Sequence, residues 1–149
     1  MYKELKGKRL LILGGMRISC EIVRKAKAMG ICTIVADYNR IEDSPGKQIA
    51  DEAADLSVID VDTVVAYIKE HAIDGVFVGF NDMLLPYYAE ICEKAGLPCY
   101  GTKKQFETLI AKDKYKALCR QFCVPTIPEY DLNDENIKYP VLVKPVDSS

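Results

Sequence analysis

The sequence predicts an α/β protein built on a doubly wound parallel sheet, and two observations support this class. Apolar runs such as "RLLILG" (9–14) and "ICTIVAD" (31–37) are continuous rather than alternating, as expected of strands buried on both faces. Segments with the apolar spacing of helices separate these runs. Right-handed crossovers between parallel strands then place helices on both faces of the sheet. We expect a Rossmann-like first domain.

Strand and helix segments alternate up to about residue 101. We expect strands at 9–14, 31–37, 56–60, within 73–82, and at 97–101. Helices are expected at 17–30, 62–71 and 83–95, with a loop and a short helix at 44–55. Glycines at 30 and 96 follow two of the helical segments and are typical helix stops.

The character of the chain changes after Gly101, where lysine-rich segments begin. The expected order is helices at 103–111 and 112–123, an extended segment at 124–130, a loop or short helix at 131–139, and a strand at 141–144. The last strand should pair with 126–130. We divide the chain into a domain of residues 1–108 and a second piece of residues 109–149.

Composition excludes several classes of function. Of the 149 residues, 49% are apolar and 28% are charged, which is a globular profile. The net charge of −2 gives no hint of nucleic-acid binding, for which a basic patch would be expected, and no apolar run approaches the ~18 residues of a membrane span. The six cysteines form no C-x-x-C pair and the only histidine is His71, so we expect neither zinc nor any other bound metal. A cytoplasmic protein is expected.

Three polar loops should meet at the carboxyl ends of the strands, where ligands of such sheets bind. They are Gly14–Gly15–Met16, Asp37–Tyr38–Asn39, and residues 79–82. We expect them to line one cleft. The helix start at 16–18 favours an anionic group such as a carboxylate, with which Arg17 can pair.

The glycine loop departs from the dinucleotide fingerprint. Asp37 ends the second strand where a ribose-binding carboxylate belongs. However, Ile18 and Ser19 stand where G-x-G-x-x-G requires further glycines. The pattern therefore disfavours NAD(P), and a Rossmann-type nucleotide- or sugar-binding module stays an alternative. Asp37 is equally suited to capping its own loop.

The second half of the chain resembles a known enzyme family. "AKDKYKALCRQFCVPTIPEY" followed by "YPVLVKPVDSS" is similar to the opening of an ATP-grasp domain. Residues 8–101 resemble the small sheet domain that precedes ATP-grasp modules in carboxylate–amine ligases, biotin carboxylase and the carbamoyl-phosphate synthase large subunit. The resemblance covers nearly the whole chain.

The resemblance implies an ATP-dependent, Mg²⁺-dependent ligase. In such enzymes ATP phosphorylates a carboxylate or bicarbonate, and an amine or other nucleophile displaces phosphate from the acyl phosphate. Lys114 matches the basic residue that contacts nucleotide phosphates, and Lys144 matches the strand lysine that reaches the α/β-phosphates. A strand-borne lysine places one charge at a fixed depth. The competing interpretation is that both are solvated surface lysines.

The resemblance also implies that the first domain binds the small-molecule carboxylate substrate. The candidate residues are Gly14, Gly15, Met16, Arg17, Asn81 and Asp82. Asp82 has a competing interpretation as a helix N-cap. Relatives of this kind also use the sheet domain in subunit contacts, so a homodimer, or a purely non-catalytic dimerisation domain, is a further alternative.

The chain stops where the resemblance places a glycine-rich phosphate loop, with the Mg²⁺ ligands expected further on. We therefore expect a truncated, N-terminal part of a ligase that carries no catalytic residue of its own. Phosphoryl transfer depends on lysines and metal together. This chain alone should bind neither ATP nor Mg²⁺ and should be inactive.

Overall fold

The computed structural model describes residues 3–131 and 133–143. The chain divides into two units, residues 1–106 and residues 107–149. This division lies close to the boundary at residue 108 that the sequence predicts. The assignment of the two parts as separate domains stays a prediction.

The first unit is built on a sheet of four parallel strands. These are β1 (Arg9–Leu13), β2 (Cys32–Asp37), β3 (Glu52–Asp55) and β4 (Gly75–Val78), in the order β3-β2-β1-β4. Leu11 of β1 lies opposite Ile34 of β2 and Val76 of β4. Leu11 and Ile12 point to opposite faces and are both fully buried, which explains the continuous apolar run.

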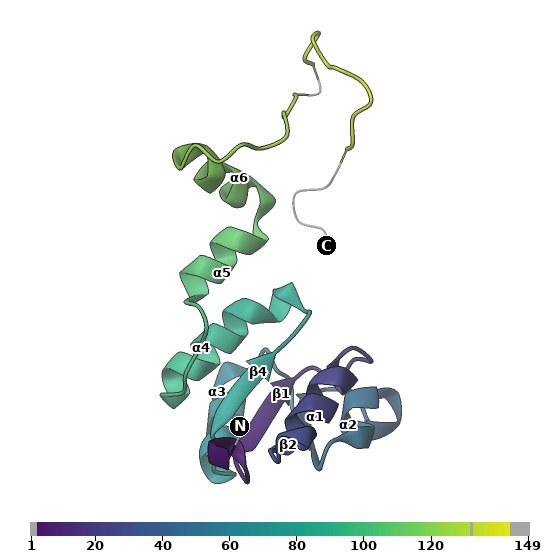
Figure 1. Cartoon of the computed structure of the whole chain (residues 1–149), viewed down its shortest axis with the longest axis vertical. Coiled ribbons are helices and arrows are strands. Elements are labelled where there is room, and N and C mark those ends of the chain that lie inside the picture. Colours follow the sequence, from purple (N-terminus) through teal and green to yellow (C-terminus); the bar gives the residue numbers. More distant parts are fainter. Residues whose placement is uncertain (1–2, 132, 144–149) are drawn as a thin grey trace. The chain divides into compact units, whose positions relative to one another are not determined.

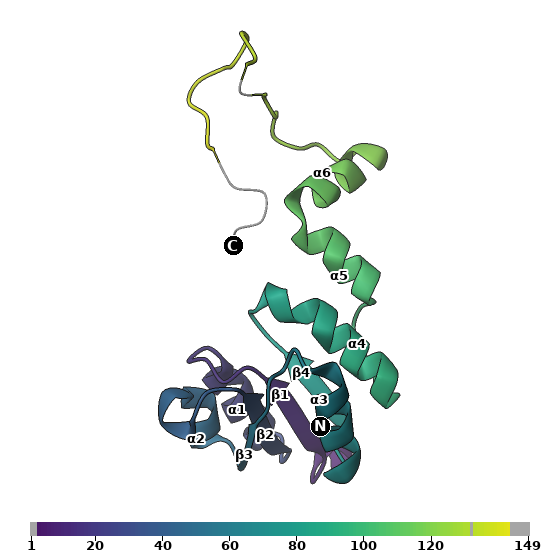
Figure 2. The ribbon, with the colours of Figure 1, turned by 180° about the vertical axis from the view of Figure 1, so that it is seen from behind.

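Helices cover both faces of this sheet. Helices α1 (Ser19–Ala28) and α2 (Pro45–Ile49) lie together on one side, and α3 (Val61–Glu70) and α4 (Leu85–Ala95) on the other (Figures 1 and 2). Val23 of α1 packs on Ile12 and Val35 in the core. The prediction of a doubly wound parallel sheet is confirmed.

Local signals set the helix ends. Asp60 caps α3 because its carboxylate accepts a hydrogen bond from the Thr63 amide, 3.2 Å away. Gly96 ends α4 in the left-handed region at φ 68°. Short 3₁₀ turns occur at η1 (Lys3–Leu5), η2 (Ile41–Asp43) and η3 (Asp82–Leu84).

Two strand predictions in the first unit are wrong. The third strand is Glu52–Asp55 rather than 56–60, because residues 57–60 form a turn that delivers the Asp60 cap. The expected fifth strand at 97–101 does not form. Pro98 lacks a backbone donor. The Leu97 amide instead bonds Cys92 of α4, and the Tyr100 ring packs among Phe77, Tyr88 and Phe106.

The second unit contains α6 (Lys112–Gln121), while α5 (Lys103–Ile110) spans the division between the units. Lys116 and Arg120 of α6 hold the Glu129 carboxylate at 2.7 and 2.6 Å. The predicted pairing of 126–130 with 141–144 is wrong for the described residues, since neither 126–130 nor 141–143 is a strand. Prolines at 125 and 128 remove donors, and Glu129 binds α6 instead.

Candidate functional site

The loops after β1, β2 and β4 lie at one edge of the sheet, here called the carboxyl edge. The loop after β1 turns at Gly14, whose φ of 90° favours glycine. The Gly14 amide donates to Ala36 O at 2.8 Å, and Ser19 Oγ donates to Gly14 O at 2.7 Å. These bonds fix where α1 begins.

Gly15 is enclosed by the loop after β2. Its amide donates to Asp37 Oδ2 at 2.8 Å, and its carbonyl accepts from the Gly46 amide at 2.8 Å. A Cβ at this position would lie 1.9 Å from Ser44 Oγ and 2.4 Å from Asp37 Oδ2. Only glycine fits, and both its backbone polar groups are already engaged.

Asp37 is a buried hub rather than an exposed loop residue. Besides Gly15, it accepts hydrogen bonds from Ser44 Oγ at 2.7 Å and the Asn39 amide at 2.8 Å, and it pairs with Lys47 Nζ at 3.1 Å. Burial pushes the pKa of Asp37 upward, but the bonds from Ser44, Lys47 and Asn39 outweigh it and leave that pKa below its usual value.

Lys47 is the residue that sequence reasoning missed. It stands in "SPGKQIAD" like any surface lysine, yet it is only 2% exposed. Its ammonium donates to Asp37 O, Asn39 O and Asp55 Oδ1 at 2.9, 2.6 and 2.8 Å. The signal for burial is the set of acceptors brought together by the fold, which a single sequence does not display.

This hub bears on the dinucleotide alternative. A dinucleotide fold offers a glycine amide to the pyrophosphate and a carboxylate to the ribose. Here the Gly15 amide and the Asp37 carboxylate bond each other. Neither group is available to a nucleotide, so the geometry counts against that alternative.

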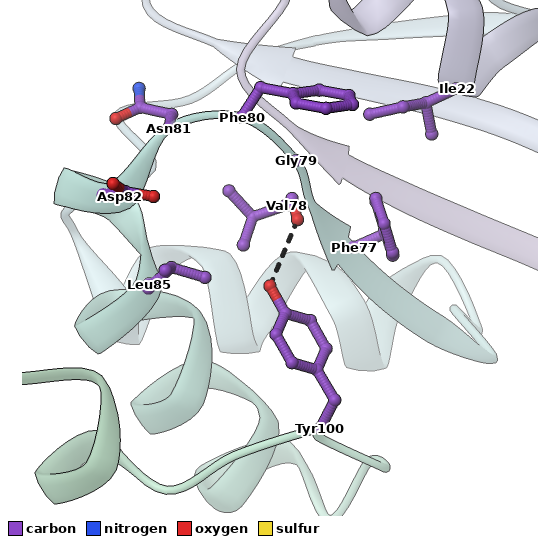
Figure 3. A pocket seen from close by; sticks show the side chains of 9 residues that line it. All are labelled: Ile22, Phe77, Val78, Gly79, Phe80, Asn81, Asp82, Leu85 and Tyr100. Atoms are coloured by element: carbon purple, nitrogen blue, oxygen red, sulfur yellow. Dashed lines mark hydrogen bonds between the residues drawn. The ribbon is translucent and has the colours of Figure 1, made fainter. Parts of the chain in front are cut away.

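A cavity of about 340 Å³ opens beside the loop after β4 (Figure 3). Its lining residues come from α1, β4, the following loop, α4 and the segment after α4: Ile22, Phe77, Val78, Gly79, Phe80, Asn81, Asp82, Leu85 and Tyr100. Phe80 is 70% exposed and has a φ of 62°, which L side chains rarely adopt. The Tyr100 hydroxyl points at Val78 O, 3.4 Å away.

Asn81 and Asp82 supply the polar end of this cavity. In Figure 3 they lie on the loop away from the apolar pair Ile22 and Phe77. Asn81, not Asp82, occupies the N-cap position of η3, and its side chain forms no capping bond. The N-cap interpretation of Asp82 is therefore wrong. The pKa of Tyr100 is raised by burial, with a contribution from the nearby Asp82 carboxylate.

The expected single cleft is also wrong. Exposed Arg17 lines a separate depression of about 520 Å³ between α1 and α2, not the cavity that holds Asn81 and Asp82. Helix α1 borders both hollows, since Ile22 lines the cavity and Cys20, Glu21 and Arg24 line the depression. Met16 is half exposed on the same loop.

The predicted phosphate lysines belong to the second unit. Lys114 is an exposed residue of α6. Lys144 lies outside the described residues. The nucleotide role of both stays a prediction. Among the described residues, no cluster of His, Cys, Asp or Glu is arranged to hold a metal ion, and none of their helices is long and apolar enough to cross a membrane.

Comparison with known proteins agrees with this parallel-sheet architecture. The model of the ATP-grasp N-terminal domain matches residues 23–99, so the chain belongs to that family. The resemblance seen in the sequence is confirmed at this level.

Two curated relatives illustrate the range of enzymes that this chain is similar to. The 2-oxoglutarate carboxylase small subunit of Hydrogenobacter thermophilus is 30% identical over 92% of this chain and 33% of its own length. A formate-dependent phosphoribosylglycinamide formyltransferase of Parasynechococcus marenigrum is 26% identical over 95% of this chain and 38% of its own. The chain thus spans about a third of the length of these relatives.

Solved structures give the same picture. The L-amino acid ligase of Bacillus licheniformis superposes with a TM-score of 0.76 at 26% identity, over 96% of this chain and 38% of the ligase. The biotin carboxylase domain dimer of the Hydrogenobacter 2-oxoglutarate carboxylase, in complex with MgADP, ADP and bicarbonate, gives 0.73 at 26% identity, over 95% and 35%.

Proposed function

We propose that this chain is the N-terminal portion of an ATP-dependent ligase that activates a carboxylate or bicarbonate as an acyl phosphate and joins it to an amine or related nucleophile. The observation that carries the proposal is the superposition of nearly the whole chain on a biotin carboxylase domain in complex with MgADP and bicarbonate. A metabolic enzyme of this kind is expected in the cytoplasm.

In this proposal the carboxyl edge binds the substrate that is not a nucleotide. Asp82 and Asn81 provide acceptors for an amine or hydroxyl group at the mouth of the cavity. Phe77, Phe80 and Tyr100 supply an apolar wall that excludes water. Arg17, exposed beside the start of α1, offers a planar cation to a carboxylate or phosphate of the substrate.

ATP and Mg²⁺ supply the phosphoryl group and its charge neutralisation in this chemistry. Of this chain's residues, Lys114 and Lys144 would contact the nucleotide phosphates. Lys114, on the first turn of α6, is exposed and therefore accessible to a phosphate. The role of Lys144 rests on the resemblance of "YPVLVKP" to the family's phosphate-binding segment.

The test uses a protein that contains this chain and has the full length of its relatives. ADP formation is measured with ATP, Mg²⁺, a panel of carboxylic acids including bicarbonate, and a panel of amines. We expect ADP only when an acid is present, and a loss of about tenfold or more in Lys144→Ala. Acid-independent ADP release, or no release with any acid, would contradict ligase chemistry.

Asp82→Asn should raise the KM for the nucleophile about tenfold while KM for ATP stays unchanged. The matched control is Asp62→Asn, since Asp62 is an exposed carboxylate on α3 that pairs only with Lys94 among the described residues. Equal effects of the two variants would remove Asp82 from the site.

Two consequences concern the isolated chain. We expect this chain alone to show neither ATP hydrolysis nor saturable MgATP binding in calorimetry. We also propose self-association as a homodimer, which the dimeric biotin carboxylase domain supports. Sedimentation at increasing concentration tests this, and a monomer throughout would contradict it.

A further inference from the structure

A buried lysine stands directly behind the carboxyl edge. Lys47 projects from α2, and its side chain is inaccessible to solvent. Its charged partners are Asp37 at the end of β2 and Asp55 at the end of β3; among the described residues no other titratable group bonds it. Burying an ammonium is unfavourable unless it is paired and hydrogen-bonded, which these acceptors achieve.

The lysine is connected to the glycine turn through one carboxylate. Asp37 Oδ1 faces Lys47 Nζ, while Asp37 Oδ2 accepts from the Gly15 amide and from Ser44 Oγ. The connection runs from α2 through β2 to the loop after β1. On the other side, Gly15 O accepts from the Gly46 amide, one residue before Lys47 in the chain. Gly15 is thus held from both sides.

An apolar side chain at position 47 would fill the space under α2 without any need for ion pairs. Lysine instead provides the counter-charge that allows the buried Asp37 to stay ionised and to accept the hydrogen bond from the Gly15 amide. Gly15 precedes Met16 and Arg17, the exposed part of the loop. The position of Arg17 at the carboxyl edge therefore depends on the orientation of the Gly15 peptide.

We propose that Lys47 is a positioning residue, which acts through Asp37 to hold the Gly15 turn and so to present Arg17 to the anionic group of the substrate. The ligand part of this inference rests on the proposed function, whereas the link from Lys47 to Gly15 does not. The experiments below separate the two.

The first experiment compares Lys47→Met, Asp37→Asn and the double variant by urea denaturation of this chain. If Lys47 serves Asp37 as counter-charge, the double variant is more stable than Lys47→Met, because it removes the unpaired buried charge. A simple packing role predicts additive losses, and additivity would overturn the proposal. Should Lys47→Met fail to fold, recovery of folding in the double variant decides the same question.

The second experiment follows the Gly15 amide by NMR. In Lys47→Met we expect the hydrogen exchange of the Gly15 amide to quicken about tenfold or more relative to that of Leu11 in β1, because the hydrogen bond from this amide to Asp37 is weakened. We also expect the pKa of Asp37 to rise, because the adjacent opposite charge of Lys47 is lost. Unchanged Gly15 exchange and an unchanged Asp37 pKa would overturn the link.

Lys27→Met is the matched control. Lys27 also bonds the segment around α2, through Asp51 at 2.8 Å and Ile49 O at 3.0 Å, but it is half exposed and does not contact Asp37. It should leave Gly15 exchange and the Asp37 pKa unchanged. Equal shifts in both variants would mean a general loosening of α2 and would refute positioning by Lys47.

The ligand readout uses the full-length protein with the acid that supports ADP formation. Lys47→Met should raise KM for that acid about tenfold with kcat nearly unchanged, as expected when a binding group is misplaced. If Gly15 responds but KM does not, the link holds and the assignment of Arg17 to the substrate fails. If no acid supports ADP formation, the NMR result stands and the proposed function fails.

Discussion

The two edges of the sheet use ion pairs in opposite ways. At the edge where the strands begin, Arg9 binds Glu52 with two bonds of 2.8 Å, and Lys8 binds Asp74 at 2.7 Å, all partly exposed to solvent. At the carboxyl edge, the side chains of Lys47 and Asp37 are 0% and 7% exposed.

Exposure decides what each pair contributes. Partly solvated pairs are weak, screened by salt and replaceable. A buried pair adds little net stability over an apolar core, but breaking it is costly because one charge is left unpaired. The carboxyl edge therefore gains a fixed geometry rather than additional stability, which is what the proposed binding loop requires.

The largest expected effect is at the enclosed glycine. Gly15→Ala should destabilise the chain by about 4 kcal/mol, since its Cβ would overlap Ser44 Oγ and Asp37 Oδ2. Gly96→Ala should lose only about 1 kcal/mol, because Gly96 has a φ of 68° but nothing within 4 Å. Urea denaturation measures both, and similar losses would mean that the carboxyl edge is not tightly packed.

The second-largest effect is expected at the buried Asp37 carboxylate, and it should depend on pH. Asp37→Asn should cost about 2 to 3 kcal/mol at neutral pH. Because the folded-state pKa of Asp37 is lowered, its contribution is present above the unfolded pKa of about 3.9 and is lost as pH falls through the folded value. The gap between variant and wild type should therefore narrow below about pH 4. A gap independent of pH would show that the Asp37 charge is irrelevant.

Salt should distinguish the two edges. Arg9→Met should lower the free energy of unfolding by about 1 kcal/mol at low ionic strength, and by less than half of that at about 1 M salt. The loss caused by Lys47→Met should fall less steeply with salt, because the Lys47–Asp37 pair is shielded from ions and only the Asp55 partner is exposed. Denaturation series at both salt concentrations test this. A loss at Lys47 that falls with salt as steeply as that at Arg9 would remove the contrast.

The smallest effect is expected at Phe80. Phe80→Gly should change stability by less than about 1 kcal/mol, since relief of the left-handed backbone offsets the loss of a largely exposed ring. Phe106→Ala, at a buried ring in the same unit, should lose about 3 to 5 kcal/mol. A large loss at Phe80 would identify its ring as part of the core instead of the cavity wall.

Sequence reasoning works where one residue type has one common environment. The apolar runs of β1 and β2 are predictable because such runs are buried on both faces. The strand "EAAD" is not, since alanine and glutamate are poor strand formers, and here Ala53 and Ala54 are held by pairing with Val35 and Ala36.

The site follows the same rule. Positions at the carboxyl edge could be anticipated from the parallel topology, which placed Asn81 and Asp82 at a cavity. The burial of Lys47 could not, because lysine is among the most exposed residue types and its acceptors come from the end of β2, the loop after β2 and the end of β3. Arg17 and Asp82 line different hollows, both bordered by α1, which strand order alone does not reveal.

The strand order also dictates when the protein can assemble on the ribosome. Strand β1 is synthesised first, yet its partner β4 ends at Val78, so one edge of β1 stays unpaired until that residue emerges. At roughly 5 to 20 residues per second, this interval lasts several seconds. During that time a nascent chain exposes the apolar strand β1, and chaperone binding in the cell is expected to concentrate on residues 9–13.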